Sequence, residues 1–199
     1  MIWIYIIYLY FVTPRDDMLH RQRSRMEVQR VLTIRKAGPD DAALLSEMGY
    51  ASYSHHFAHL WHQQHELQAF LQQEYSLNTL QQSLQSDVSD WFIAQDHAPV
   101  GFAKVSWHYT GEGDSLAGTL LHKLYLLPGK TGKGYGEQMI AEIERRAKSR
   151  GETFFWLEVL DANPQAYRFY LRQGFTHLKD TVFSTPSQQS LLHILGKSI

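Results

Sequence analysis

The hydrophobic positions of the chain follow two periods, and their order predicts a domain that mixes strands and helices. Short runs of alternating or continuous apolar residues are typical of strands, and apolar residues at every third or fourth position are typical of helices. The strand pattern covers residues 31–35, 91–95, 99–108, 120–127, 154–160, 175–183 and 191–195. The helix pattern begins at 38–41, recurs once or twice within 66–85, and covers 137–150 and 163–174. The order β-α-α-β-β-β-α-β-α-β-β predicts an α/β fold with a mixed sheet.

The most informative stretch is the junction between the predicted strand 120–127 and the helix that follows it. The strand pattern breaks at Pro128-Gly129, and further glycines follow at 132, 134 and 136. A turn of this kind before a helix presents backbone N–H groups that can hold an anion, and glycine lets the backbone approach the ligand closely. Lys130 and Lys133 add positive charge. The junction therefore predicts a phosphate-binding turn.

Two common phosphate-binding motifs do not fit this turn. A nucleoside-triphosphate loop, GxxxxGK[ST], would use Gly129-Lys130-Thr131 but needs a glycine where the chain has Leu124. A dinucleotide loop, GxGxxG, would begin at Gly132 but has Glu137 in place of its third glycine. Both nucleotide classes are therefore excluded on the motif.

The turn resembles the acyl-CoA loop of the GNAT N-acetyltransferase superfamily, [QR]xxGx[GA]. The matching residues are Thr131, Gly132, Lys133, Gly134, Tyr135 and Gly136, and Thr131 departs from the usual Gln or Arg. A second family pattern, LxVxxxNxxAxxFYxxxGF, is matched about 30 residues later. It is carried by Leu157, Val159, Asn163, Ala166, Phe169, Tyr170, Gly174 and Phe175. The resemblance covers residues 31–199.

The resemblance implies the GNAT fold, whereas periodicity alone implies only an α/β domain with a mixed sheet. In the GNAT fold a mixed, twisted central sheet of about six to seven strands is flanked by about four helices. Its two central parallel strands splay apart and admit the pantetheine arm of acyl-CoA. We expect this domain to span residues 31–199 and residues 1–30 to be an N-terminal extension outside it.

The resemblance also implies how acetyl-CoA, the co-substrate, would be held. The backbone amides of 131–136 would bind the pyrophosphate. Backbone groups of Leu126 and Leu127 would pair with pantetheine, and one of these amides would polarise the thioester carbonyl. Asn163 matches the family residue that contacts the CoA arm, and it is also a plausible helix N-cap.

Three residues are candidates for proton transfer. Tyr170 matches the general acid of the family, although a tyrosine at this position also suits a helix-face aromatic. Glu158 lies twelve residues earlier, like the glutamate that acts as base in the ribosomal-protein acetyltransferases of this superfamily. His122 is its competitor because histidine titrates near neutrality, and its alternative is a core histidine satisfied by a neighbour. A water chain without a dedicated base stays open.

The predicted reaction is transfer of an acetyl group to a primary amine. The absence of cysteine excludes a cysteinyl intermediate, which favours direct transfer in a ternary complex. The acceptor classes left open are a polyamine, an amino acid or antibiotic, and a peptide amine. The alternative is a non-catalytic, acyl-CoA-binding regulatory protein.

Composition and charge limit the expected domain number, binding partners and cellular location. A chain of 199 residues with 44% hydrophobic content and net charge −1 suits one domain and gives no reason to expect nucleic-acid binding. We expect a cytoplasmic protein, with a homodimer as one assembly. Residues 1–12 are apolar or aromatic but too short to span a bilayer. An over-extended translation start is favoured there over a membrane-surface anchor.

A histidine-rich stretch follows the first predicted helix. The apolar stripe of that helix is Leu44, Leu45, Met48 and Ala51. The histidines are His55, His56, His59, His62 and His65. Zinc would suit their spacing, but no carboxylate stands at the spacing of a helical zinc motif. We therefore expect no metal and a polar connection between helices. The resemblance implies that this connection lines the acceptor cleft.

Overall fold

The computed structural model describes residues 32–111 and 116–199, which form one seven-stranded sheet with helices on both faces. The strands are β1 (Thr33–Lys36), β2 (Ser89–Asp96), β3 (Ala98–Thr110), β4 (Ala117–Leu126), β5 (Phe154–Leu160), β6 (Thr176–Ser184) and β7 (Gln189–Ser198). The α-helices are α1 (Ala42–Phe57), α2 (Gln64–Tyr75), α3 (Leu77–Ser83), α4 (Tyr135–Ser149) and α5 (Pro164–Arg172). Short 3-10 turns, η1 (Pro39–Asp41) and η2 (Ala58–Leu60), flank α1. The predicted fold class is confirmed.

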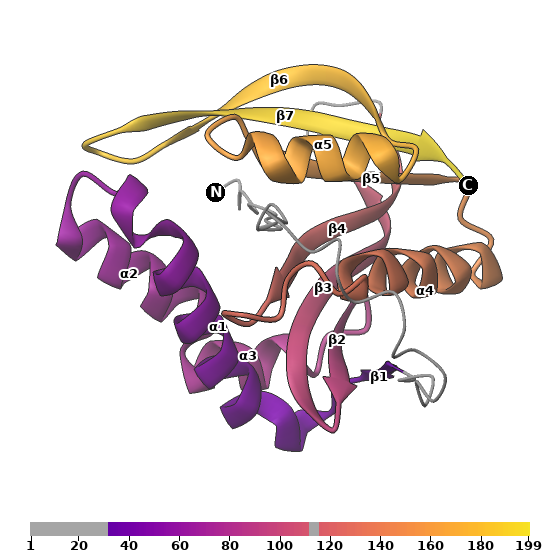
Figure 1. Cartoon of the computed structure of the whole chain (residues 1–199), viewed down its shortest axis with the longest axis horizontal. Helices are drawn as coiled ribbons and strands as arrows, with labels where there is room; N and C mark the ends of the chain where they lie inside the picture. Colours follow the sequence, from indigo (N-terminus) through magenta and orange to yellow (C-terminus); the bar gives the residue numbers. More distant parts are fainter. Residues whose placement is uncertain (1–31, 112–115) are drawn as a thin grey trace, which may run out of the picture.

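The sheet has the order β1-β2-β3-β4-β5-β7-β6. Every neighbouring pair is antiparallel except β4 and β5, which run parallel. In Figure 1 these two strands lie at the centre, with β1–β3 on one side and the β6–β7 hairpin on the other. The helix α4 provides the crossover between the parallel strands, as parallel pairing requires.

The central parallel pair comes apart after three positions. Pairing covers Thr119↔Phe155, Leu120↔Trp156 and Leu121↔Leu157, whereas β4 continues to Leu126 and β5 to Leu160. The carboxyl-terminal halves of both strands therefore face each other across a gap without a ladder between them. This is the predicted splay.

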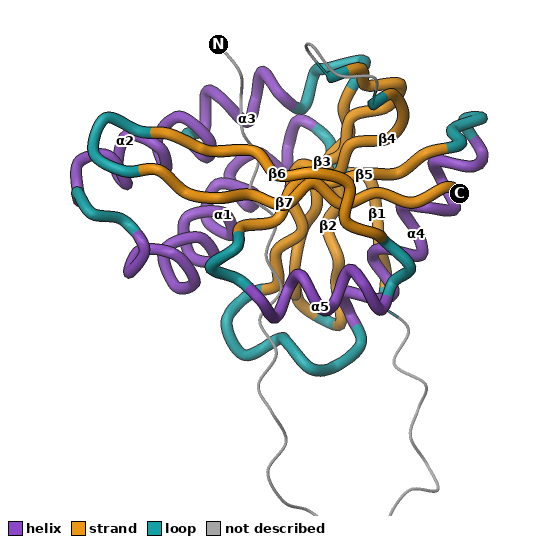
Figure 2. The backbone as a smooth tube through the Cα atoms, turned by 90° about the horizontal axis from the view of Figure 1, so that it is seen from above, coloured by secondary structure: helices purple, strands orange, loops and turns teal. Residues whose placement is uncertain are grey.

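The helices divide the core into two main layers, one on each face of the sheet. One apolar cluster joins α4 and α5 to the sheet through residues such as Met139, Ile143 and Phe169. The other joins α1, α2 and α3 to the opposite face through residues such as Leu45 and Leu71. Figure 2 shows α1–α3 on one side of the strands and α4 on the other. Both layers reach the gap, since β4 and β5 contribute to each.

The predicted element bounds hold best where caps or glycines mark them. The strand β5 has the predicted bounds 154–160, and α4 ends before Gly151, whose φ of 79° suits glycine. Ser76 separates the predicted 66–85 segment into two helices by accepting a hydrogen bond from the amide of Thr79 at 3.3 Å. These three boundaries follow from local signals.

The helix α1 differs from its prediction in which side chains face the core and in where it ends. Ala51 was expected in the apolar stripe but is exposed, and Ser52 and Tyr53 face the core instead. The helix also continues to Phe57, so His55 and His56 are helical rather than part of a connection. Aromatic packing of Tyr53 and Phe57, with ring centroids 4.8 Å apart, stabilises this last turn.

The structure leaves the N-terminal prediction untested, and it bears on membrane crossing only within the described residues. The expected N-terminal extension, residues 1–30, lies outside the described residues, so the domain boundary stays a prediction. Across 32–111 and 116–199, no helix is both long and apolar enough to cross a membrane.

The close contact between α1 and α2 gives a stability prediction. A Cβ on Gly49 would lie 2.1 Å from Cδ1 of the buried Tyr75, so Gly49→Ala forces two helices apart. We expect it to lower the free energy of unfolding by about 1–3 kcal/mol, the usual cost of overpacking. Gly38→Ala is the matched control, because nothing lies within 4 Å of its added Cβ. Chemical denaturation of both variants measures the difference, and equal stabilities would contradict this packing.

Candidate active site

The mouth of the gap is formed by the turn between β4 and α4. The amide of Lys130 donates to the carbonyl of Leu127 at 3.0 Å, and Gly129 has a φ of 73°. Proline followed by glycine with positive φ is typical of a type II turn. The chain then reaches Gly134, the N-cap of α4, in the left-handed conformation with a φ of 74°. The first amides of α4 have no carbonyl one turn earlier within the helix, so they can bind an anion.

Tyr135 anchors this turn rather than lining it. Its side chain is buried in the core, and its hydroxyl donates to a carboxylate oxygen of Asp96 at the end of β2. Only the backbone of Tyr135 can therefore serve the ligand. Thr131, Gly132 and Lys133 are half-buried or exposed, as a binding loop requires.

The end of β4 has one residue whose backbone groups face the gap. The amide of Leu127 donates to the carbonyl of Val100 at 2.9 Å, and its own carbonyl accepts from Lys130. Since backbone groups alternate in direction along a strand, those of Leu126 point away from β3. This geometry favours Leu126 over Leu127 for pairing with pantetheine.

Asn163 and Tyr170 carry buried polar atoms on the α5 side of the gap. Oδ1 of Asn163 accepts from the amide of Ala166 at 3.0 Å, which confirms the N-cap. Among the described residues, neither Nδ2 of Asn163 nor the hydroxyl of Tyr170 has a hydrogen-bond partner. Unpaired buried polar groups are costly and point to a missing ligand.

Tyr170 is fully buried between the rings of Phe169 and Phe175, 5.1 Å and 5.7 Å away. Burial raises the pKa of its phenol well above the ordinary value. The hydroxyl therefore stays protonated at neutral pH, which is the state that a hydrogen donor needs.

Glu158 lies on the other face of β5. Leu157 and Val159 pack in the same apolar cluster as Tyr170, and alternation directs Glu158 toward the α1–α3 face. It is half-buried and is the first residue of β5 beyond the pairing with β4. Glu158 and Tyr170 therefore approach the gap from opposite faces.

His122 occupies a bulge at the point where β4 leaves β5. Lys104 pairs with Lys123 and Val105 with Leu121, so His122 is the additional residue on β4. It is buried, with Nε2 2.6 Å from Oγ of Ser106. Burial, aided by the charges of Lys104 and Lys123, lowers its pKa well below the ordinary value. This arrangement favours a core histidine over the predicted catalytic role.

His56 lies at the gap, although the sequence analysis did not select it as a candidate base and placed it only in the connection expected to line the acceptor cleft. It projects from the last turn of α1, and its Nε2 lies 3.3 Å from the carbonyl oxygen of Leu126. A carbonyl only accepts, so Nε2–H donates and the lone pair of the neutral ring lies on Nδ1. Burial lowers the pKa of His56, against the opposing effect of the Leu126 hydrogen bond. The sequence signal was its place in the histidine-rich stretch, which was assigned to a connection.

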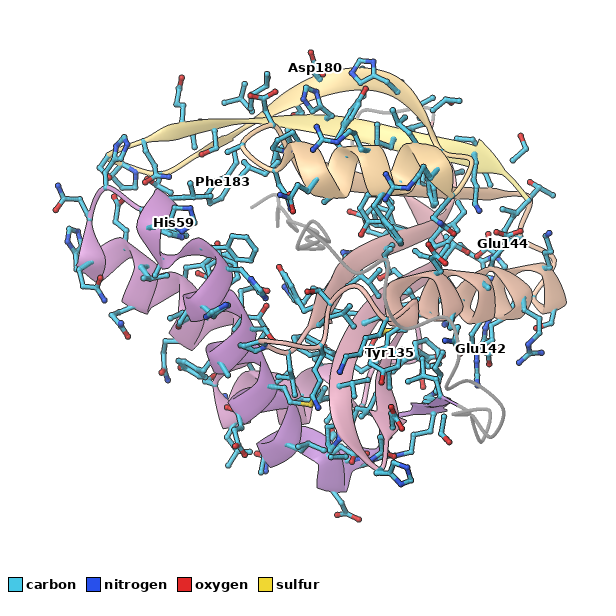
Figure 3. All side chains as sticks on the ribbon, in the orientation of Figure 1. His59, Tyr135, Glu142, Glu144, Asp180 and Phe183 are labelled. Carbon is cyan, nitrogen blue, oxygen red and sulfur yellow. The ribbon has the colours of Figure 1, made fainter. Side chains whose placement is uncertain are left out.

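A small aromatic pocket lies between the end of α1 and the β6–β7 hairpin. Its lining residues are Tyr53, Phe57, Leu60, Trp61, Leu160, Phe183, Gln188 and Ser190. Figure 3 shows Phe183 reaching from β6 toward the segment that carries His59. The rings of Trp61 and Phe183 lie 6.3 Å apart across the pocket.

The far wall of this pocket is held in place by hydrogen bonds. The amide of His62 donates to Oε1 of Gln188 at 2.8 Å, and Oγ1 of Thr185 donates to Glu66 at 2.8 Å. These bonds connect the α1–α2 segment to the hairpin turn. No three of the histidines from 55 to 65 bring their nitrogens together, judged over the described parts of the chain.

A parallel pair that opens beside a helix start able to bind an anion is the arrangement that an acyl-CoA site would require. The acetyltransferase (GNAT) family model matches residues 51–175, which is more than half of the chain. The chain therefore belongs to the GNAT acetyltransferase family, and the predicted enzyme class is confirmed.

Individual relatives agree with this assignment. Streptothricin acetyltransferase from Streptomyces lavendulae is 32% identical over 83 residues, which cover 42% of this chain and 41% of that protein. This match spans less than half of the relative's length.

Solved structures share the fold. The PaiA N-acetyltransferase from Thermoplasma acidophilum, in complex with coenzyme A, is 22% identical with a TM-score of 0.68, covering 85% of this chain and 99% of that one. The ribosomal-protein-S18-alanine N-acetyltransferase from Escherichia coli is 17% identical with a TM-score of 0.59, covering 85% and 94%.

The turn gives a binding prediction with a matched control. Gly134 and Gly129 have φ values of 74° and 73°, and neither has an atom within 4 Å of an added Cβ. Alanine therefore costs similar backbone strain at both, about 1–2 kcal/mol. Only Gly134 caps α4, so Gly134→Ala should weaken CoA binding by about tenfold or more, equivalent to one hydrogen bond to a charged group. Isothermal titration calorimetry measures this, and equal losses in both variants would show that the turn does not bind CoA.

Proposed function

We propose that the protein transfers an acetyl group from acetyl-CoA directly to a primary amine in a ternary complex. The observation that carries this proposal is the pair of unpartnered buried groups, the Tyr170 hydroxyl and Nδ2 of Asn163, beside the open strands. A pantetheine arm in the gap would give both groups hydrogen-bond partners. The same gap would expose the thioester to the opposite face of the sheet.

The two faces of the gap suit the two halves of the reaction. The amine nitrogen attacks the thioester carbonyl, the C–N bond forms, and the C–S bond breaks. The amine proton leaves through a base on the α1 face, and the thiolate receives a proton from Tyr170 on the α5 face. The amide of Leu126 would stabilise the oxyanion that forms between these two steps.

His56 and Glu158 are the two candidate bases on the α1 face. A primary alkylamine has a pKa of about 10.4 and is almost entirely protonated at neutral pH, so it must lose a proton before attack. His56 is the better placed of the two, because its Nε2 is already bonded to Leu126 at the gap. Glu158 would then hold or relay the proton, or attract the incoming ammonium group.

The aromatic pocket between α1 and the β6–β7 hairpin supports a small-molecule acceptor. Its aromatic lining suits an amine carried on an apolar or cationic group, since ring faces attract cations. Similarity to streptothricin acetyltransferase agrees with a small amine rather than a protein. A ribosomal-protein N-terminus, favoured by the position of Glu158, is the other acceptor to test.

Substitution of Tyr170 tests the catalytic role. Tyr170→Phe should lower kcat by about 100-fold, the usual effect of losing a general acid, and change the Kd for CoA little. Tyr167→Phe on the same helix is the control and should keep normal turnover. Thiol release from acetyl-CoA, measured against a panel of amines, gives both rates. Normal turnover in Tyr170→Phe would remove the general acid, and CoA binding without release for any amine would favour the non-catalytic alternative.

Substitution of His56 gives a pH-dependent effect. Because the pKa of His56 lies below its ordinary value, the ring is neutral at pH 7 and can act as a base. His56→Gln should therefore lower kcat/KM by about 100-fold at pH 8. The ratio of unaltered to variant rates should shrink as the pH falls through the His56 pKa, since the protonated ring is inactive.

The exposed His59, on the turn that follows α1, provides the control for this profile. His59→Gln should leave kcat/KM unchanged between pH 5 and pH 9. A constant ratio for His56→Gln across that range would assign His56 a structural role only.

A further inference from the structure

Three side chains on the β6–β7 hairpin bring metal-binding atoms together away from the transferase gap. Nε2 of His177 lies 2.7 Å from Oδ1 of Asp180, and Nδ1 of His193 lies 2.8 Å from the same oxygen. One donor atom from each residue falls within 4.8 Å of the others. In Figure 3 Asp180 lies on the outer side of the hairpin, whereas Phe183 points toward the pocket.

A β-bulge is the reason that these residues meet. Residues three apart on a regular strand, such as His177 and Asp180, point to opposite faces. Here His177 pairs with Leu195 and Lys179 with Ile194, so Leu178 is an additional residue that re-aims His177. Asp180 pairs directly with His193, and all three side chains then share the face that carries α5.

A second carboxylate orients the central histidine. Nε2 of His193 lies 2.9 Å from Oδ1 of Asp161, the residue that follows β5. A carboxylate at one ring nitrogen fixes the proton there and directs the other nitrogen toward a metal, an arrangement common around metal-ligating histidines. The ring of Tyr167 packs against His193 at 5.0 Å and further restricts it.

We propose that His177, His193 and Asp180 form a zinc site, with Asp161 as a positioning residue for His193. Two imidazole nitrogens and one carboxylate are a ligand set that zinc prefers, with a fourth position left for water. Tetrahedral bonds of about 2.0–2.1 Å separate donors by about 3.3 Å. The two contacts to Asp180, at 2.7 Å and 2.8 Å, would lengthen slightly, and the two histidine nitrogens, which lie within 4.8 Å of each other, would adjust to the same spacing. This proposal replaces the expectation of no metal, which rested on residues 55–65.

The proposed ion would fasten the hairpin to the start of α5. Asp161 belongs to the β5–α5 connection, which also contains the N-cap of α5, and the hairpin supplies one wall of the aromatic pocket. The site needs no part of the transferase chemistry. It can therefore be tested without acetyl-CoA or an acceptor.

The test is zinc binding by the full chain after chelator treatment. Isothermal titration calorimetry with zinc chloride at pH 7.5 should give one ion per chain, and zinc should raise the thermal midpoint. His177→Ala is the main variant, because the side chain is 40% exposed and its loss should not prevent folding. It should weaken binding at least tenfold. Asp161→Asn should weaken binding by about tenfold, as loss of an outer carboxylate usually does.

His59→Ala is the matched control, because it removes an exposed histidine from the 55–65 stretch and leaves the hairpin intact. Zinc affinity should be unchanged in this variant. The proposal fails if the unaltered chain binds no zinc, if His177→Ala binds as tightly as the unaltered chain, or if His59→Ala loses affinity to the same extent. Thermal midpoints in chelator establish that each variant is folded.

Discussion

The early end of the β4–β5 ladder is the constraint on which the rest of this structure depends. Each strand continues past the last paired residues, so the backbone groups between Leu121 and Leu126 on that side lack a neighbouring strand. Buried backbone groups need partners, and a sheet that opens at its centre must obtain them from somewhere other than a ladder. His56 reaches the carbonyl of Leu126 from one face, and an extended acyl-CoA arm is suited to the rest. The opening therefore carries a cost in the free protein that ligand binding would reverse.

The helices on the two faces of the sheet carry a proton donor on one side of the gap and a proton acceptor on the other. On the apolar α5 face, burial raises the pKa of the Tyr170 phenol, so the hydroxyl keeps the proton that it can donate. On the α1 face, burial lowers the pKa of His56, so at neutral pH the ring is uncharged and can take up a proton. The same physical effect, loss of solvation, moves the two groups in opposite directions because one is charged when deprotonated and the other when protonated. A donor and an acceptor on opposite sides of the gap suit a reaction in which one proton leaves the nucleophile and another reaches the leaving group.

Sequence reasoning predicted the features around the gap that depend on local backbone conformation. The glycine turn, the Asn163 cap and the bounds of β5 depend on backbone conformation and continuous burial, and both leave local signals. His56 was missed because the extent of α1 depends on aromatic packing against other elements. Tyr135 was assigned to the binding loop, but its side chain is buried in the core. There its hydroxyl donates a hydrogen bond to Asp96, which is distant in sequence. The hydrogen bond from the amide of Leu127 to the carbonyl of Val100 likewise depends on the register of β3 and β4. Hydrophobic periodicity does not predict strand register.

The two bulges in the sheet show why alternation alone fails at functional positions. One places His122 and Lys123 on the same face, so His122 meets Ser106 in the core rather than the gap. The other turns His177 to the face of Asp180 and His193, although their spacing in sequence predicts separation. The extra residue in a bulge disrupts the ladder hydrogen bonds locally. In return, a side chain points in a direction that a regular strand does not allow. Where a bulge joins groups of matching chemistry on an exposed face, as at His177, that cost is better explained by a ligand than by packing, because the side chains it brings together contribute little to the core.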